Sequence, residues 1–190
     1  MQPYVLYSDF NCPFCYAMHE QLWELGLACA VEWRGVQHAP HLPVPMKAWH
    51  GVLEFELKQE VALVTRLVPQ LAIAPPLGKP NTRAAIAAAR VLQQDAAKGE
   101  LLVRVLYAAL WRDGLDLSNQ TILHSAVSSV GAQTEALSPV SDAVDQILDQ
   151  WDEQWRSTGS CSVPLLVSPE GDQLAGFSRA PDVLRFFSRP

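Results

Sequence analysis

The chain has 190 residues and a mass of 21.0 kDa, enough for one domain with a large insertion or for two small domains. Its formal net charge of −6 argues against a nucleic-acid partner, which would require a basic surface. Hydrophobic residues make up 49% of the chain, but no apolar run approaches the roughly 20 residues that span a bilayer, so no membrane partner is expected. The first residues lack the features of a secretion signal, and we expect a soluble cytoplasmic protein.

The first predicted elements are a strand and a helix joined by a pair of cysteines. The apolar run Tyr4-Val5-Leu6-Tyr7 predicts the strand, and the helix is expected from Pro13 to about Leu25, ending at Gly26. Between them stands Cys12-Pro13-Phe14-Cys15. Cys12 is expected at the N-cap and Pro13 at the first helical position, where a missing N–H is no loss. Two thiols one helical turn apart can form and exchange a disulfide, so the motif predicts a redox site.

The two thiols are expected to differ in reactivity. An exposed Cys12 thiolate would face the positive end of the helix, which lowers its pKa below the usual value of about 8.5 and makes Cys12 the attacking thiol. Cys15 lies inside the first turn and suits the resolving role. Phe14 adds no positive charge, which predicts a mild oxidant. In the cytoplasm the pair would be kept largely reduced, so it would act as a reductant, an isomerase or a glutathione partner.

Two other interpretations of the motif are disfavoured. A structural zinc site needs four ligands, but Cys29 and Cys161 are isolated and His19 does not complete a set, so no metal is expected. A permanent structural disulfide across so short a loop would contribute little stability, and the chain shows no sign of export.

The middle of the chain is predicted to be helical. A second strand over Ala30–Val36 is followed by a loop rich in Pro and His, from His38 to Pro45, and strand signals then disappear for over a hundred residues. Apolar periodicity, caps and breakers predict helices over Gly51–Val68, Thr82–Ala97 (capped by Asn81, closed by Gly99), Leu101–Trp111 and Asn119–Val130 (capped by Ser118). A last one starts at Ser138 and Pro139, with Val140, Val144, Leu148, Trp151 and Trp155 on one apolar face.

Strands return near the end of the chain. Val163–Val167, a turn over Ser168–Asp172 and Gln173–Phe177 predict a β-hairpin. A terminal helix is expected to start at Pro181 and to bury one face, made of Val183, Leu184, Phe186 and Phe187. A proline that opens a strand opposite a Cys-x-x-Cys suggests a cis peptide between Val163 and Pro164, which exposes backbone groups beside the thiols.

This order of elements resembles the thioredoxin fold, βαβ and ββα, with a large all-helical domain inserted between the halves. The chain resembles the DsbA-like thiol-disulfide oxidoreductases, in the branch related to 2-hydroxychromene-2-carboxylate isomerases and kappa-class glutathione transferases. The matching segments are residues 7–16, Asn81-Thr82-Arg83 and Gly159–Val167. The resemblance implies an α/β fold with a thioredoxin-like domain over residues 1–42 and 158–190 and an inserted helical domain over 43–157.

The resemblance also implies roles for particular residues. Cys12 would be the nucleophile and Cys15 the resolving thiol; the substrate would be contacted by Pro13, Phe14, Val163 and a cis Pro164. Isomerases and transferases of this branch typically have serine in place of Cys12, and the transferases usually carry an acidic residue where this chain has Ser178. The oxidoreductases tend to have glycine where Ser162 stands.

The leading hypothesis is therefore a protein disulfide oxidoreductase acting on a disulfide-bearing protein or small thiol substrate. No tightly bound cofactor is expected, and glutathione is a candidate substrate or reductant. Two alternatives stay open: a glutathione-dependent isomerase or transferase, and a non-enzymatic binding module on the same fold.

Four further residues are placed near the predicted site. His38, His41 and Asn81 are expected near the rim of a cleft that the inserted helices wall on one side. Cys161, three residues before Pro164, is either a small buried filler or an auxiliary thiol that exchanges with the redox pair. The sequence leaves the oligomeric state open.

Overall fold

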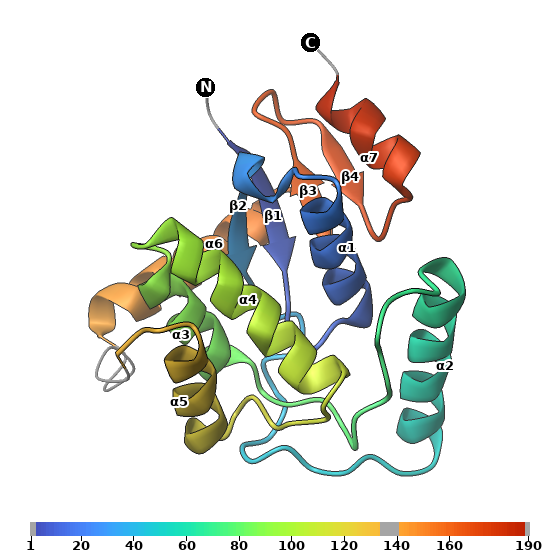
Figure 1. The fold of residues 1–190 in the computed structure, drawn as a ribbon, viewed down its shortest axis with the longest axis vertical. Helices are drawn as coiled ribbons and strands as arrows, with labels where there is room; N and C mark the ends of the chain where they lie inside the picture. Colours follow the sequence, from blue (N-terminus) through green and yellow to red (C-terminus); the bar gives the residue numbers. More distant parts are fainter. Residues whose placement is uncertain (1–2, 134–140, 189–190) are drawn as a thin grey trace.

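The computed structural model describes residues 3–133 and 141–188 and contains one four-stranded sheet (Figure 1). The strands lie in the order β2-β1-β3-β4, with β1 and β2 parallel and the other two pairs antiparallel. Their bounds are Tyr4–Ser8 for β1, Val31–Gly35 for β2, Leu165–Val167 for β3 and Gln173–Ala175 for β4. The predicted mixed α/β fold, with βαβ and ββα halves that share one sheet, is confirmed.

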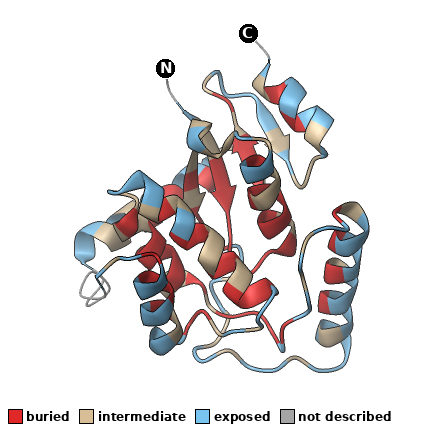
Figure 2. Cartoon of the chain, in the orientation of Figure 1, coloured by how far each residue is buried: buried red, intermediate tan, exposed pale blue. Residues whose placement is uncertain are grey.

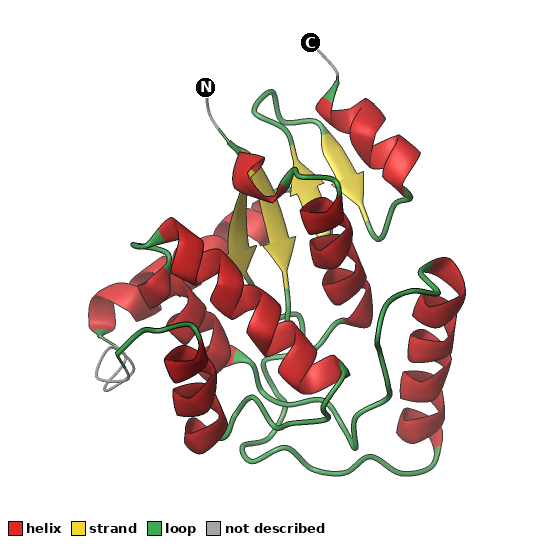
Figure 3. Cartoon of the chain, viewed as in Figure 1, coloured by secondary structure: helices red, strands yellow, loops and turns green. Residues whose placement is uncertain are grey.

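Helices fill the chain between β2 and β3 and cover the sheet (Figure 3). The helices of the described residues are α1 (Pro13–Glu24), a 3-10 turn η1 (Ala28–Ala30), α2 (Val52–Leu67), α3 (Arg83–Leu92), α4 (Ala96–Trp111), α5 (Gln120–Ser129), α6 (Asp142–Ser157) and α7 (Ala180–Phe187). Of these, α2 to α6 lie between β2 and β3. No helix among the described residues is long and apolar enough to cross a membrane.

The two parallel strands form the centre of the molecule. In β1, Leu6, Tyr7 and Ser8 are all buried, because helices cover both faces of this strand. In β2 only alternate positions, Trp33 and Gly35, are buried. A Cβ at Gly35 would lie 2.5 Å from Cγ2 of Ile86, so glycine is what lets α3 pack directly against the end of β2.

One apolar core joins the sheet to the inserted helices (Figure 2). Aromatic side chains from both parts meet in it: the Phe10 ring lies 4.8 Å from Tyr107 of α4 and 5.1 Å from Trp33 of β2, centroid to centroid. Two hydrogen bonds reinforce the junction. The Trp111 indole donates to the carbonyl oxygen of Phe10 (2.7 Å), and the hydroxyls of Ser8 and Tyr107 are 2.6 Å apart. The insertion is thus packed against the sheet rather than tethered beside it.

The predicted helix over Thr82–Ala97 is wrong: α3 ends at Leu92 and α4 begins at Ala96. Asp95 interrupts the pattern, because its carboxylate accepts a hydrogen bond from the N–H of Lys98 and so caps a new helix. Gly99 lies inside α4 instead of closing a helix. A Cβ there would approach the Cα of Gln93 to 2.8 Å, so the glycine permits the tight turn between the two helices.

Three helix ends also differ from expectation. Asn119, not Ser118, caps α5, and α7 begins at Ala180, one residue before Pro181. The last inserted helix is capped by Ser141; the predicted start at Ser138 and Pro139, together with Val140, lies outside the described residues.

The apolar faces predicted for the last two helices are largely confirmed. In α6 the residues Leu148, Trp151 and Trp155 are buried. In α7 Val183 and Phe186 are buried, but Leu184 is 45% exposed, so the face is narrower than predicted.

Candidate active site at the start of α1

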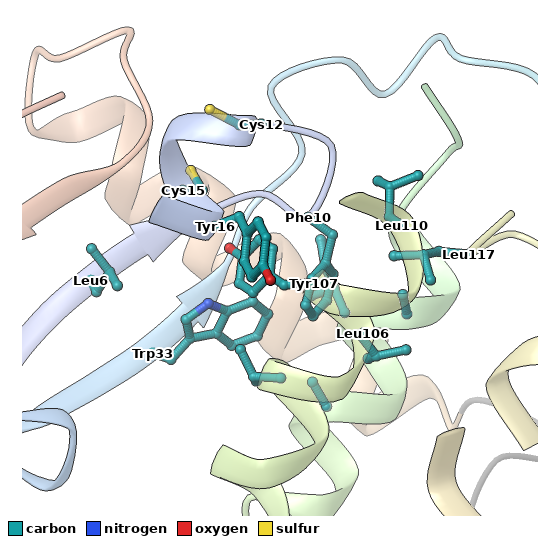
Figure 4. Close-up of a cluster of buried hydrophobic side chains, with 14 of the residues drawn as sticks. Leu6, Phe10, Cys12, Cys15, Tyr16, Trp33, Leu106, Tyr107, Leu110 and Leu117 are labelled. Carbon is teal, nitrogen blue, oxygen red and sulfur yellow. The ribbon is translucent and has the colours of Figure 1, made fainter. Parts of the chain in front are cut away.

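Cys12 and Cys15 lie in the first turn of α1, at the end of β1 (Figure 4). Cys12 is the N-cap, with extended backbone angles, and Pro13 is the first helical residue, as predicted. The Cys12 thiol donates to the carbonyl oxygen of Val163 at 3.6 Å, and the Cys15 sulfur accepts from the N–H of Asp9 at 3.5 Å. The expectation of an exposed Cys12 is wrong: Cys12 is 7% exposed, because the segment before β3 lies against it, and Cys15 is fully buried.

That segment contains a cis peptide bond between Val163 and Pro164. Pro164 is buried and Val163 is half-buried, and the carbonyl of Val163 accepts the hydrogen bond of the Cys12 thiol. A second cis bond, between Val44 and Pro45, lies in the loop after β2 and was not anticipated from the sequence.

The environments of the two thiols shift their pKa values in opposite directions. A hydrogen bond from the Cys15 side chain does most to lower the pKa of Cys12; the charges of His38 and Lys79 act in the same direction, and burial opposes them. Burial raises the pKa of Cys15 well above its usual value, and the neighbouring Cys12 raises it further. The asymmetry favours ionisation of Cys12 over Cys15.

A buried carboxylate, Asp9, organises the backbone beneath the thiols. Its Oδ1 accepts hydrogen bonds from the N–H of Asn11 (3.2 Å) and the hydroxyl of Thr82 (2.8 Å). Its Oδ2 accepts from the N–H of His38 (3.0 Å) and lies 2.8 Å from Nδ1 of the same residue. Asp9 is fully buried, so all four contacts are made away from water. The sequence analysis did not select Asp9; its position three residues before the first cysteine is the local signal that could have identified it.

Two basic side chains, His38 and Lys79, act on the redox turn from outside α1. Burial lowers the pKa of His38, but the hydrogen bond and negative charge of Asp9 outweigh it, so the net effect is a raised pKa. The His38 side chain is 29% exposed. Lys79, which the sequence analysis did not select, is buried, and its Nζ lies 2.7 Å from a carboxylate oxygen of Glu60. Neither residue lies in the Cys-x-x-Cys motif, yet both bring positive charge to Cys12.

Asn81 holds the loop that carries His38. Its carbonyl oxygen accepts from Nε2 of Gln37 (3.0 Å) and from the N–H of Arg83, and its Nδ2 donates to the carbonyl oxygens of Pro40 and Leu42, both at 3.1 Å. Asn81 therefore positions the loop. His41, expected at the same rim, is exposed.

The remaining predicted residues differ in exposure. Pro13 is buried, and Phe14 is half-buried against an apolar cluster that includes Ala17, Val64 and Val68. Cys161 is exposed and free, so its interpretation as a buried filler is wrong. Among the described residues, no group of three His, Cys, Asp or Glu side chains could hold a metal ion.

A thioredoxin-type sheet, a helical insertion and two cysteines at the start of the first helix define a thioredoxin-fold protein with a Cys-x-x-Cys site. The chain belongs to the family described as DSBA-like thioredoxin domain, whose profile matches residues 5–185. The predicted family is thereby confirmed. None of the curated proteins matches the sequence.

Solved structures with the same fold include an isomerase and disulfide oxidoreductases. A 2-hydroxychromene-2-carboxylate isomerase is 13% identical, with a TM-score of 0.74, 99% of this chain covered and 95% of that one. The cytosolic disulfide reductase DsbM from Pseudomonas aeruginosa, solved with GSH, is 12% identical, with a TM-score of 0.72 and coverages of 98% and 96%. A probable DsbA oxidoreductase from Streptomyces coelicolor is 17% identical, with a TM-score of 0.72 and coverages of 100% and 92%. At these identities the similarity is one of fold.

Proposed function

We propose that the protein is a thiol-disulfide oxidoreductase in which Cys12 attacks a disulfide and Cys15 resolves the intermediate. The observation that carries the proposal is the pairing of two free thiols, one helical turn apart, in environments that shift their pKa values in opposite directions. The buried Asp9 and the cations His38 and Lys79 support it, because they place positive charge near the sulfur that must be ionised.

The reaction follows from this arrangement. The Cys12 thiolate attacks one sulfur of the substrate disulfide, the S–S bond breaks, and the departing thiolate takes up a proton. Cys15 then loses its proton, and its thiolate attacks the Cys12 sulfur of the mixed disulfide, which releases the second substrate thiol. The products are a Cys12–Cys15 disulfide and two substrate thiols, so the protein is oxidised by two electrons. A separate thiol reductant, such as glutathione, restores the dithiol.

The contact between Cys12 and the Val163 carbonyl supports a substrate-binding role for the segment before β3. An extended substrate that displaces the thiol from this carbonyl can lie along the Val163–Pro164 backbone, in contact with the Cys12 turn. In this proposal Pro13 and Phe14 form the other side of the contact, and the reaction takes place in the cytoplasm, where DsbM from Pseudomonas aeruginosa is also described as acting.

Reduction of insulin disulfides by glutathione, with and without the protein, tests the proposal. Cys12→Ser should abolish the activity, and Cys15→Ser should accumulate a mixed disulfide with substrate that is visible by mass spectrometry. A Cys29→Ser/Cys161→Ser variant is the control and should retain activity, because both of those thiols are exposed and outside the first turn of α1. Persistent activity in Cys12→Ser would contradict the assignment.

A glutathione-dependent isomerase or transferase is the second candidate, favoured by the shared fold with 2-hydroxychromene-2-carboxylate isomerase. The two candidate functions differ in their need for the second cysteine, Cys15, because isomerisation requires only the group that holds glutathione. An isomerase would keep its activity in Cys15→Ser, whereas a disulfide oxidoreductase would stop at the mixed disulfide.

A further inference from the structure

A cavity lies at the opposite end of the parallel strands from Cys12. Its volume is about 430 Å³, and α1, η1, the beginning of β2 and the first turns of α4 border it. Cys12 follows the carboxyl end of β1, whereas Cys29 of η1 precedes the amino end of β2. The five residues of β2 alone span about 17 Å, so the two sites are separate.

The inner wall of this cavity is apolar. Leu6, Leu22, Trp33 and Val103 line it, and each is itself buried in the core. Toward α4 the wall consists of short side chains, Ala96, Ala97 and Gly99. Because these α4 side chains are short, the cavity between them and the buried apolar residues stays open. Its volume falls within the roughly 300–1,000 Å³ typical of small-molecule sites.

The polar groups at the cavity carry uncompensated negative charge. Glu100 is half-buried, and no hydrogen bond or ion pair joins it to another described residue. Glu32 also lines the cavity but is paired with Arg34, at 2.7 Å. The positive end of α4 would favour an anion, but the carboxylate of Asp95 already caps it. The charge left over at the cavity is therefore that of Glu100.

A buried imidazole adds unused hydrogen-bonding capacity. His19 lines the cavity and is 6% exposed, and its Nδ1 makes no hydrogen bond with a described residue. The carboxylate of Glu20 lies 3.9 Å from this atom, beyond hydrogen-bond distance. Buried polar atoms without partners are rare in folded proteins, so this one requires an explanation.

We propose that this cavity binds a small aromatic amine, with the ring against Trp33 and the buried leucines and the ammonium group at Glu100. An aromatic body matches the apolar wall, and the cation matches the one unpaired carboxylate. This site is independent of the redox chemistry proposed for Cys12 and Cys15.

Cys29 gives a direct readout of occupancy, because it is an exposed thiol on the cavity wall. Iodoacetamide alkylation of the whole protein, quantified by peptide mass spectrometry, reports the rate at Cys29. The exposed Cys161 lies outside the cavity and serves as the internal control. Tryptamine should slow alkylation of Cys29 in a saturable manner and leave Cys161 unchanged. Indole-3-propionate carries a carboxylate in place of the ammonium group on the same ring system. It should bind at least about tenfold more weakly than tryptamine, as expected when a charge pair is lost.

Two variants separate the charge from the cavity. Glu100→Gln should remove the preference for tryptamine, whereas Glu153→Gln, an exposed carboxylate on α6, should not. Ala97→Leu places a larger side chain on an exposed position of the wall and should weaken both indoles. Equal protection by the two indoles would overturn the assignment of Glu100, and absence of protection at Cys29 at millimolar ligand would overturn the site. Neither outcome bears on insulin reduction, which depends on Cys12.

Discussion

At the scale of single residues, the candidate site depends on Asp9. One buried carboxylate ties together the turn before Cys12, the loop after β2 and the start of α3. Its partners His38 and Thr82 lie 29 and 73 positions further along the chain. The result is a His38 imidazole with a raised pKa, held near Cys12 by a group that is itself shielded from water. This supplies the positive charge that Phe14 lacks, so we expect a stronger oxidant than the motif alone predicts.

Replacing His38 by glutamine should raise the pKa of Cys12, because a nearby positive charge that favours the thiolate is lost. Thiolate absorbance near 240 nm, followed against pH in a Cys29→Ser/Cys161→Ser background, measures this. His41→Gln removes an exposed histidine from the same loop and should leave the titration unchanged. An unaltered Cys12 titration in His38→Gln would show that this cation does not act on the thiol.

At the scale of elements, an ion pair links the redox helix to the insertion. Arg104 of α4 donates two hydrogen bonds to Glu20 of α1, at 2.8 and 2.9 Å, and its guanidinium lies 4.7 Å from the Trp23 ring centroid. Burial disfavours the charged form of Glu20, but His19 and Arg104 outweigh it and lower its pKa to about 2. Because α1 carries both cysteines, this contact fixes the redox turn relative to α4.

The ion pair of Glu20 and Arg104 should make the free energy of unfolding depend on pH in the acid range. The folded-state pKa of about 2 lies below the ordinary 4.5, so the stabilisation is complete above pH 4.5 and is lost as the pH falls toward 2. Glu20→Gln should lower the free energy of unfolding at pH 7 by about 1–3 kcal/mol. Urea unfolding at several pH values should show the difference from wild type shrinking over this acid range.

Glu54→Gln is the matched control, because Glu54 pairs with Lys58 on the surface of α2. An exposed ion pair is screened by water, so its loss should change stability little. A Glu20→Gln effect no larger than that of Glu54→Gln, or one that does not change with pH, would contradict the role given to the pair.

At the scale of the whole molecule, the sheet and the inserted helices share one core. The buried hydroxyl pair of Ser8 and Tyr107 and the bond from Trp111 to Phe10 cross the boundary between the two halves of the fold. The redox turn lies directly above this junction, as the close-up of the cluster shows (Figure 4). We therefore expect the insertion and the sheet to unfold together, although the division into two domains predicted from the sequence stays a prediction.

Tyr107→Phe tests this junction, because it removes one hydroxyl and leaves the Ser8 hydroxyl buried without its partner. The free energy of unfolding should fall by about 1–2 kcal/mol. In wild type and variant alike, helix content by circular dichroism and the accessibility of the buried Cys15 to a thiol reagent should change at the same urea concentration. Exposure of Cys15 before the helices melt would show that the two parts unfold separately.

Short sequence patterns were sufficient to predict the local features of the site and the order of the elements. Cys12 at the N-cap, Pro13 at the first helical position and the hairpin of β3 and β4 follow from short patterns, because each depends on residues close together in the chain. The apolar stripe of α6 was readable for the same reason: its residues recur at the helical period.

The surroundings of the thiols could not be predicted in this way, because they depend on how distant segments pack together. Asp9, His38 and Lys79 meet through contacts between distant segments, and no local pattern records such contacts. The cover over Cys12 likewise comes from Val163, 151 positions away. The break between α3 and α4 was missed because an alanine-rich stretch continues the helical pattern, whereas the close packing of Gly99 against Gln93 requires a turn there. Local chemistry selected the reactive pair, and long-range packing determined its electrostatic environment.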